Sequence, residues 1–329
     1  MNVPVSVIVC AHDEEQNLRE LLPLLLNQNH PEFELIFVND RSNDGTYDWL
    51  LEETKKHPNF KMVNVANKPE HVNGKKFALT LGIKAAKYDW VLLTDADCRP
   101  ASNEWIRQMA ASFTDQSHAV LGYSPYQPQQ GLLNSFVRFE TVITAIQYFS
   151  FALMGSPYMG VGRNLAYRKN LFIQNKGFSQ HLEVTGGDDD LFINRFAEGG
   201  KVAVAIRSTA LTISKPKTTW REFWQQKIRH LAVGKFYTTK SKLMLAPFTL
   251  SWSLFWPAAV ALAFTQYVFV GPILLMRWLV QWLTIFRFRR ETAERLETWK
   301  LPFLDFIFGF YYLVAGFKAL FTKRVKWKT

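Results

Sequence analysis

Cysteine is scarce in this sequence, because Cys10 and Cys98 are the only two among 329 residues. Two cysteines so far apart imply no disulfide framework and suit a reducing compartment. The sequence begins Met-Asn-Val-Pro and passes directly into a strand-like run, without the basic n-region or cleavage site of a secretory precursor. We therefore expect the N-terminal part of the protein to stay in the cytosol.

Formal charge is absent from a long C-terminal stretch, since none of the 34 residues from Leu243 to Met276 carries one. A membrane-spanning helix needs about 20 mostly apolar residues. The sequence therefore predicts spans at about 245–264, which Pro247 and Pro257 would bend, and at 266–286. A buried soluble core is the alternative, but it needs more polar surface than this region supplies.

Three charges lie inside the apolar segments 266–286 and 301–321. Arg277 lies within the second predicted span. An arginine inside a membrane is energetically costly, and it often has a function or faces the polar interior of a helix bundle. Segment 301–321 contains Asp305 and Lys318, so it is either a third span or an interfacial or re-entrant segment.

The sequence is basic overall, with a formal net charge of +11. It shows no compact Lys/Arg patch interleaved with aromatics and no recognition helix, so nucleic acid is not an expected partner. Much of the excess flanks the apolar region, at Lys235, Lys240, Lys242, Arg287, Arg289, Arg290, Lys323, Arg324, Lys326 and Lys328. This distribution is typical of positive-inside anchoring. It predicts a catalytic part on the cytosolic side of the cell (inner) membrane. The basic tail also prefers the cytosol, which favours the interpretation that segment 301–321 does not span the membrane.

The first 125 residues alternate between strand-like and helix-like segments. Strands are predicted at 5–10, 33–38, 61–65, 90–94 and 119–123, and helices at 14–27, 44–56, 75–86 and 105–113. Alternation of this kind predicts an α/β fold, a mostly parallel sheet with helices on both faces. We expect a catalytic domain at 1–240 and a membrane region at 241–329.

Polar and acidic residues follow three of these predicted strands. They are Ala11-His12-Asp13-Glu14, Asn39-Asp40-Arg41-Ser42 and Asp95-Ala96-Asp97. In parallel sheets, ligands bind beyond the carboxyl ends of the strands. The alternative reading is that these are turn residues and helix caps, with Asp13 as the N-cap of helix 14–27.

Asp95 and Asp97 are candidates for a metal site. Residues i and i+2 of a strand face the same way, about 6.5–7 Å apart, so both carboxylates would reach one volume with Ala96 turned away. Hard oxygen ligands suit Mg²⁺ or Mn²⁺ shared with a diphosphate. Asp-x-Asp is a weak motif alone, and its place after the apolar run Val91–Thr94 strengthens it.

The ordered motifs resemble a known family. The run 5–9, the segment 39–46, Gly74-Lys75 with Ala78-Leu79, and Asp95-Ala96-Asp97 look like the nucleotide-binding half of family 2 glycosyltransferases, which have the GT-A fold. Gly187-Asp188-Asp189-Asp190-Leu191 resembles the family's Glu-Asp-x-Asp-Leu segment, and Gln226-Lys227-Ile228-Arg229-His230 its Gln-x-x-Arg-Trp segment. The resemblance covers about residues 3–235.

The resemblance implies roles at the donor side. Asp40 would bind the nucleotide base, and the chain around Ala11 and Glu14 would line the base and ribose. Lys75 would lie near the nucleotide or sugar, and Asp95 would contact the ribose or sugar.

The resemblance also implies the reacting groups. Asp97 would hold the divalent metal, and Asp188 would be the general base that takes the acceptor's proton. Gln226 and Arg229 would lie by the diphosphate or acceptor.

Some positions depart from the family pattern. Gly187 replaces a glutamate, so Asp189 is an alternative base, and His230 replaces the tryptophan that polymer-making relatives use at the acceptor site. Arg163 and Asn164 either line the acceptor site or are structural residues.

Three adjacent aspartates at 188–190 repel one another, so at least one should have a raised pKa or a cationic neighbour. The alternative is that they sit at the N-terminus of a helix over 191–197, whose dipole favours acids.

Together these features predict an inverting, metal-dependent glycosyltransferase. It would move a sugar from a nucleotide-diphosphate sugar, of uridine type, to a lipid or lipid-linked acceptor at the membrane. A processive polysaccharide synthase and an inactive membrane-tethered nucleotide-sugar binder are the alternatives. A nucleotidyltransferase would leave the segments at 188 and 226 without a purpose.

Overall fold

The structure is a computed structural model that describes residues 3–197 and 201–322 of the chain. The basic residues at 323–328 therefore lie outside the described residues. The chain divides into two compact units, one of Met1–Pro125 with Gln147–Lys215 and one of Tyr126–Ile146 with Pro216–Thr329.

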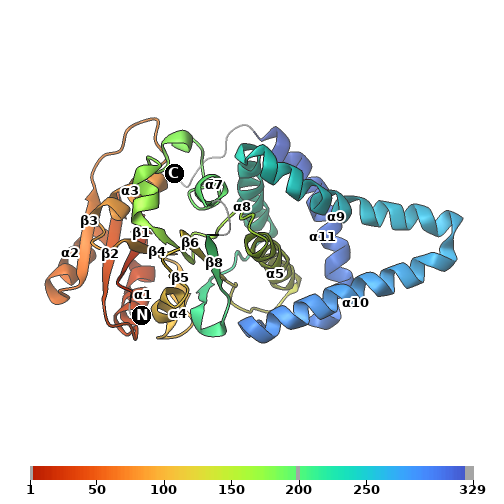
Figure 1. Ribbon diagram of the computed structural model, residues 1–329, viewed down its shortest axis with the longest axis horizontal. Coiled ribbons are helices and arrows are strands. Elements are labelled where there is room, and N and C mark those ends of the chain that lie inside the picture. The colour runs from red at the N-terminus through yellow and green to blue at the C-terminus, as the bar shows by residue number, and fades with distance from the viewer. Residues whose placement is uncertain (1–2, 198–200, 323–329) are drawn as a thin grey trace. The chain divides into compact units, whose positions relative to one another are not determined.

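The first unit is built on a seven-stranded sheet (Figure 1). Its strands lie in the order β3 (Phe60–Val65), β2 (Phe33–Asp40), β1 (Val5–Ala11), β4 (Trp90–Asp95), β7 (Leu165–Arg168), β6 (Ala119–Gly122) and β8 (Val202–Ala205). All neighbours pair in parallel except β7, which runs antiparallel to both β4 and β6. Two short strands, β5 (Cys98–Pro100) and β9 (Thr212–Ser214), form a separate antiparallel pair.

Helices cover both faces of this sheet because the strands are apolar on both. Val5, Val7 and Val9 of β1 belong to one buried core with residues of α1 (Glu15–Leu26), α2 (Thr46–Lys56) and α4 (Trp105–Ala110). On the opposite face lies α3 (Gly74–Ala85), and Gly82 lets it come close to Ile8 and Val38, since a Cβ there would lie under 3.0 Å from both side chains. The predicted mixed, mostly parallel α/β sheet is confirmed.

The carboxyl ends of β1, β2 and β4 meet at one edge of the sheet. The register pairs Ala11 with Asn39 and Cys10 with Asp95. The three polar clusters of the sequence therefore lie along the same edge, as their positions after strands indicate.

One predicted cap is wrong. The N-cap of α1 is Glu14, which makes no side-chain capping bond, and Asp13 lies one residue earlier with φ at 55°. The Oδ2 atom of Asp44 accepts a hydrogen bond from the Glu15 amide instead, at 3.2 Å. A carboxylate from the neighbouring loop thus caps this helix, which no local pattern reveals.

The last part of the first unit carries α6 (Lys169–Gln174), η1 (Ser179–His181), α7 (Asp190–Phe196) and η2 (Ser208–Ala210). An aromatic cluster holds α6 and α7 against β7, and its rings are Tyr167, Phe172, Phe178 and Phe192. This packing fixes where the loop before α7 delivers Asp188.

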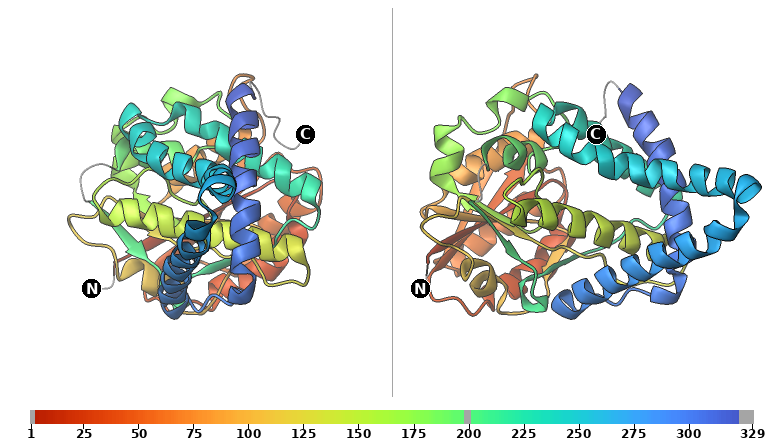
Figure 2. Two further views of the ribbon diagram at one scale, coloured as in Figure 1. Left: turned by 90° about the vertical axis from the view of Figure 1, so that its right-hand side faces the viewer. Right: turned by 45° about the vertical axis from the view of Figure 1, so that its right-hand side comes forward.

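The second unit consists of helices. α5 (Leu132–Leu153) begins in it and ends in the first unit; the others are α8 (Trp220–Val233), η3 (Gly234–Phe236), α9 (Thr239–Thr265), α10 (Tyr267–Thr292), η4 (Thr298–Lys300) and α11 (Leu301–Phe321). Figure 2 shows α9 and α10 as two long helices joined by a tight turn. In the described chain, three helices are long and apolar enough to cross a membrane: α9, α10 and a helical segment at Thr298–Ala319. The predicted span at 245–264 lies within α9, and the one at 266–286 lies within α10 except for Gln266.

Two of the charges inside these apolar helices, Arg277 and Asp305, pair with each other. Arg277 of α10 donates from Nε and Nη2 to the two carboxylate oxygens of Asp305 on α11, both at 2.8 Å. Gln281 adds a third bond at 2.8 Å, and Asp305 is fully buried. The guanidinium also lies over the rings of Trp252 and Phe255, 4.5 and 4.0 Å from their centroids. The polar environment that the sequence required for Arg277 is therefore supplied by Asp305.

Candidate active site

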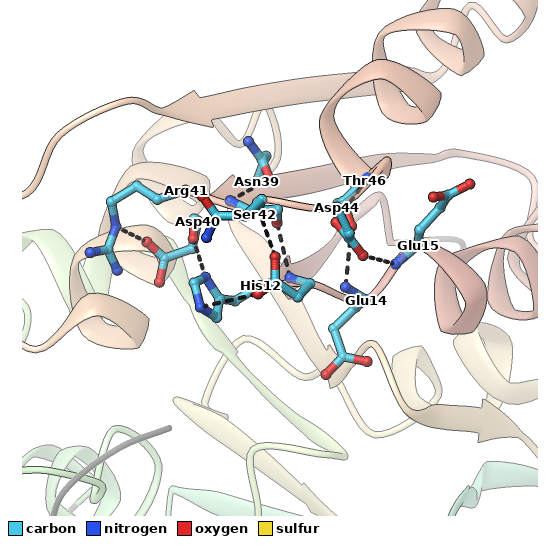
Figure 3. A network of polar contacts seen from close by, with 11 residues as sticks. His12, Glu14, Glu15, Asn39, Asp40, Arg41, Ser42, Asp44 and Thr46 are labelled. Atoms are coloured by element: carbon cyan, nitrogen blue, oxygen red, sulfur yellow. Dashed lines mark hydrogen bonds and ion pairs between the residues drawn. The ribbon is translucent and has the colours of Figure 1, made fainter. Parts of the chain in front are cut away.

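A network of polar contacts joins the ends of β1 and β2 (Figure 3). Asp40 is buried, and its Oδ1 atom accepts a hydrogen bond from Nε of Arg41 at 2.8 Å. The Nδ1 atom of His12 lies 2.6 Å from the Asp40 carbonyl oxygen. Gly74 packs closely against the side chains of Arg41 and Asp40. A Cβ at this position would lie 2.6 Å from Nη2 of Arg41 and 2.9 Å from Oδ2 of Asp40, so a larger residue would displace them.

The same network ties the loop after β1 to the loop after β2. The Asp13 carboxylate accepts a hydrogen bond from the Asn43 amide at 2.6 Å, and the Glu14 amide donates to Oγ1 of Thr46 at 3.1 Å. The half-buried Glu14 carboxylate accepts from the Asn17 side chain at 2.6 Å. These bonds tie the loop that carries Asp13 and Glu14 to the loop that follows Asp40.

Lys75 connects two acidic segments of the first unit. From the first turn of α3, its Nζ atom lies 2.9 Å from Oδ1 of Asp95 and 3.4 Å from Oδ2 of Asp188. Asp95 ends β4, whereas Asp188 lies in the loop before α7. Three residues that the sequence singled out separately therefore form one charged cluster.

The pKa shifts follow from this cluster. Burial alone would lower the pKa of Lys75, but Asp188 and Asp95 outweigh it and raise that pKa well above its ordinary value. Burial alone would raise the pKa of Asp188, but Lys75 and Lys76 outweigh it and lower that pKa. Both Lys75 and Asp188 are therefore charged at neutral pH.

Asp189 has a different environment from Asp188. Burial and the charge of Asp188 raise the pKa of Asp189 to about 6. Its Oδ2 atom accepts a hydrogen bond from the Gly162 amide at 2.7 Å, and Oδ1 accepts one from the Asp190 amide at 2.8 Å, where Asp189 caps α7. Both interpretations of the three adjacent aspartates therefore apply. Asp189 caps α7 and has a raised pKa, whereas Asp188 has cationic neighbours in Lys75 and Lys76.

Asp95, Asp97 and Cys98 form a group of possible metal ligands at the end of β4. One ligand atom from each lies within 4.8 Å of the others. Strand alternation is the wrong reason for this closeness, since β4 ends at Asp95 and Asp97 lies in the turn before β5. The turn brings oxygen atoms of the two carboxylates within 4.8 Å of each other. Ala96 is buried in the core, as expected.

Cys98 is the member of this group that sequence reasoning missed. Its thiol is buried and lies 3.0 Å from Oγ of Ser214. Burial raises the pKa of the Cys98 thiol far above its ordinary value, so it is a poor metal ligand beside two carboxylates. Two half-exposed carboxylates with hard oxygen atoms fit Mg²⁺ or Mn²⁺.

Comparison with known proteins adds the family. Residues 6–174, more than half of the 329, match the family described as Glycosyl transferase family 2. The chain belongs to glycosyltransferase family 2. The match covers β1 through β7, and with them Asp40, Lys75, Asp95 and Asp97.

The chain is also similar to individual bacterial proteins. The chain is 26% identical over 255 residues to the probable glycosyltransferase YdaM of Bacillus subtilis, covering 72% of this chain and 56% of the relative. It is 36% identical over 93 residues to a poly-β-1,6-N-acetyl-D-glucosamine synthase of Staphylococcus epidermidis, covering 28% of this chain and 21% of the relative. The chain thus spans about half of the first relative and a fifth of the second.

A solved structure shares the fold of this family 2 chain. It is a mannosyltransferase from Pyrobaculum calidifontis in complex with GDP-Man and Mn²⁺, with a TM-score of 0.63 and 17% identity. The likeness covers 98% of this chain and 89% of that one. It supports the GT-A architecture of the sheet and helices.

Asn164 and Arg163 follow the Gly160-Val161-Gly162 segment of the family 2 chain. Asn164 is fully buried; its Nδ2 donates to the carbonyls of Tyr123 and Ala210, both at 2.8 Å, and its Oδ1 accepts from Nε1 of Trp105 at 3.0 Å. These contacts favour the structural reading of Asn164. The half-buried Arg163 lies near Cys98, where its charge opposes the rise in the pKa of the thiol.

Three of the predicted diphosphate or acceptor residues lie on one helix of the second unit. Gln226, Arg229 and His230 belong to α8, three and four positions apart, so they share a face of that helix. Gln226 and Arg229 are half-buried and His230 is exposed.

Sequence reasoning missed Lys76. It is fully buried, and its Nζ atom donates to the carbonyl oxygens of His181 at 2.7 Å and Val184 at 2.8 Å. The helical spacing of the sequence could have indicated that Lys76 is buried. Leu79 and Ile83, three and seven positions further on, share its face of the helix and are both buried.

Proposed function

We propose that this protein is an inverting, metal-dependent glycosyltransferase that moves a sugar from a nucleotide-diphosphate sugar to a lipid or lipid-linked acceptor. The observation that carries the proposal is the Lys75 ammonium group between Asp95 and Asp188, 2.9 and 3.4 Å from their oxygens. A cation that contacts both a proposed metal-binding carboxylate and a proposed general base suits a reaction that releases a diphosphate and deprotonates a hydroxyl.

The donor would lie along the edge formed by β1, β2 and β4. Asp40, held by Arg41 and positioned beside Gly74, would bind the base, and the chain at Ala11 and Glu14 would line the base and ribose. The uridine type of the donor is a proposal. The GDP-Man of the Pyrobaculum mannosyltransferase is a second donor to test.

Asp97 and Asp95 would hold the divalent ion, Mg²⁺ or Mn²⁺. When bound there, the ion would neutralise charge on the leaving diphosphate. Lys75 already pairs with Asp95, so it adds a fixed positive charge on the same side.

Asp188 would be the general base. Its ionised carboxylate would take the proton of the acceptor hydroxyl as the oxygen bonds to the anomeric carbon. The bond between that carbon and the diphosphate oxygen breaks, and its electron pair leaves with the diphosphate. Attack from the face opposite the leaving group inverts the anomeric configuration. Asp189 is the less suitable base because both its oxygens accept backbone hydrogen bonds.

The acceptor is proposed to come from the membrane. Helices α9, α10 and the segment at Thr298–Ala319 have the length and composition of membrane spans. In this arrangement 1–240 forms the cytosolic catalytic domain at the cell (inner) membrane and 241–329 anchors it. Gln226, Arg229, His230 and Arg163 are proposed at the diphosphate or acceptor side.

A processive polysaccharide synthase is the second candidate. The local similarity to the Staphylococcus epidermidis synthase, 36% over 93 residues, favours it. His230, in place of the tryptophan of polymer-making relatives, counts against it.

The experiment is to incubate membranes containing the full chain with radiolabelled nucleotide sugars and Mn²⁺. Label in a discrete lipid extract supports the lipid acceptor. A ladder of long products on a gel supports the polymerase, and donor binding without transfer or hydrolysis supports an inactive binder. The Asp188→Asn chain is the control for label that does not depend on the proposed base.

A further inference from the structure

Lys76 is an unusual residue because it is a lysine without any exposed surface. Lysine is almost never fully buried unless it is paired. No carboxylate within residues 3–197 and 201–322 lies at ion-pair distance from its Nζ atom, so its partners are the two carbonyl oxygens of His181 and Val184. An apolar side chain would fill the same space at lower cost.

The two carbonyls belong to a short loop that leads along the chain to Asp188. The loop follows η1 and turns on itself, with a hydrogen bond of 3.1 Å from the Val184 amide to the His181 carbonyl. A third bond joins it to α3, from the Asn73 amide to the Leu182 carbonyl at 3.0 Å. Four residues beyond Val184 the chain reaches Asp188.

The start of α3 therefore holds Asp188 in two ways. Lys75 contacts the Asp188 carboxylate directly, at 3.4 Å. Lys76 and Asn73 hold the backbone that leads to it. The side chain of Asn73 in turn accepts from the Lys76 amide at 3.3 Å, which fixes the first turn of the helix.

We propose that Lys76 is a positioning residue, whose ammonium group fixes the loop of residues 181–184 and thereby places Asp188 for proton transfer. The proposal rests on the proposed function of Asp188 and deepens it. Lys76 touches neither substrate nor metal in this scheme. It acts through two backbone carbonyls.

The charge of Lys76 serves the same end. Burial lowers the pKa of Lys76 to about 8, while Asp188 and Asp189 oppose that change, so the group is charged at pH 7. Hydrogen bonds from a charged donor are roughly twice as strong as neutral ones. The same charge lowers the pKa of Asp188.

The test compares Lys76→Met with three other variants of the full chain in detergent. Lys76→Arg keeps the charge, and Lys84→Met is the matched control, because Lys84 is an exposed residue on the same helix. Lys76→Gln is measured in parallel as a milder change, in case Lys76→Met fails to fold. The first readout is hydrogen exchange of peptides covering 181–188, which needs no substrate.

We expect exchange in that segment to rise by about tenfold in Lys76→Met, with less change in Lys76→Arg and none in Lys84→Met. Peptides of β1 and β4 should exchange as before. Unchanged exchange at 181–188 in both Lys76→Met and Lys76→Gln would overturn the proposal, as would an equal rise in Lys84→Met.

The second readout is the split between kcat and KM. A misplaced base should lower kcat by about 10²-fold, with the donor KM changed less than about threefold, and Lys76→Arg should recover part of the loss. A fall in donor affinity with kcat intact would overturn the positioning role. If Asp188→Asn keeps full turnover, the proposed base is wrong, and the exchange data still decide whether Lys76 fixes the loop.

Discussion

Lys75 and Asp188 form an ion pair, with 3.4 Å between Nζ and Oδ2. Lys75 lies in the first turn of α3 and Asp188 lies in the loop before α7, so the contact joins two segments that are distant in the sequence. Because Asp95 lies 2.9 Å from the same nitrogen, this pair links the proposed metal-binding residues to the proposed base.

Removal of the proposed base should stop transfer without loss of the donor. In Asp188→Asn we expect turnover to fall by about 10²–10⁴-fold, the usual worth of a general base. Nucleotide binding, followed by calorimetry, should stay within a few fold of the original. The same substitution at Asp189 tests the alternative base, and a larger loss there than at 188 would exchange the two roles.

Lys75 should set the pH dependence of the reaction. Its positive charge lowers the pKa of Asp188, so Lys75→Met should raise that pKa. Activity needs ionised Asp188, and the acid limb of the kcat/KM profile should therefore move to higher pH. Lys75→Arg retains the charge and should leave the limb near its original place. A limb that stays fixed in Lys75→Met would show that Asp188 does not control it.

Metal binding should depend on Asp97. In Asp97→Asn the affinity for Mn²⁺, measured by electron paramagnetic resonance, should weaken by roughly tenfold or more, as metal sites lose 10–100-fold even when an outer partner is removed. A chelator should abolish transfer by the unmodified chain. Asp48→Asn, at an exposed position on α2, is the matched control. Equal Mn²⁺ affinity in both variants would remove Asp97 from the metal site.

Asn164 should matter for stability. Asn164→Ala leaves the indole N–H of Trp105 and the carbonyls of Tyr123 and Ala210 without their buried partner. We expect the free energy of unfolding to fall by about 3 kcal/mol or more, since three buried groups lose a partner and each unsatisfied buried group costs about 1–3 kcal/mol. Urea denaturation measures this, with the exposed Asn170→Ala as control. A stable variant with a raised acceptor KM would instead place Asn164 at the acceptor.

The Arg277–Asp305 pair should show strong coupling. Arg277→Leu or Asp305→Leu alone leaves one buried charge without its partner and should lower the stability by about 3–5 kcal/mol, whereas the double variant should be near neutral. Thermal unfolding in detergent provides the double-mutant cycle. Additive losses in the double variant would mean that the two side chains do not interact in the folded protein.

Local sequence patterns were sufficient to predict most of the strands and helices in the first 125 residues. The β-branched run at 5–10 became β1, and the leucine spacing of 14–27 became α1, because burial of a periodic apolar face decides such segments. Polar residues after strands indicated the edge of the site, since parallel strands end together. The capping of α1 was not predictable in this way, because Asp44 reaches the helix from another loop.

The sequence by itself determined which chemical groups are present and roughly where each lies along the chain: a sheet edge with Asp40 and Asp95, an aspartate triplet at 188–190, and apolar helices containing Arg277 and Asp305. Only the tertiary structure decided their partners. Lys75 bridges Asp95 and Asp188, Lys76 holds two loop carbonyls, and Arg277 neutralises Asp305. The physical reason is range, because hydropathy and helix period act between near neighbours, whereas a buried charge takes whichever opposite charge or carbonyl the fold brings within about 3 Å.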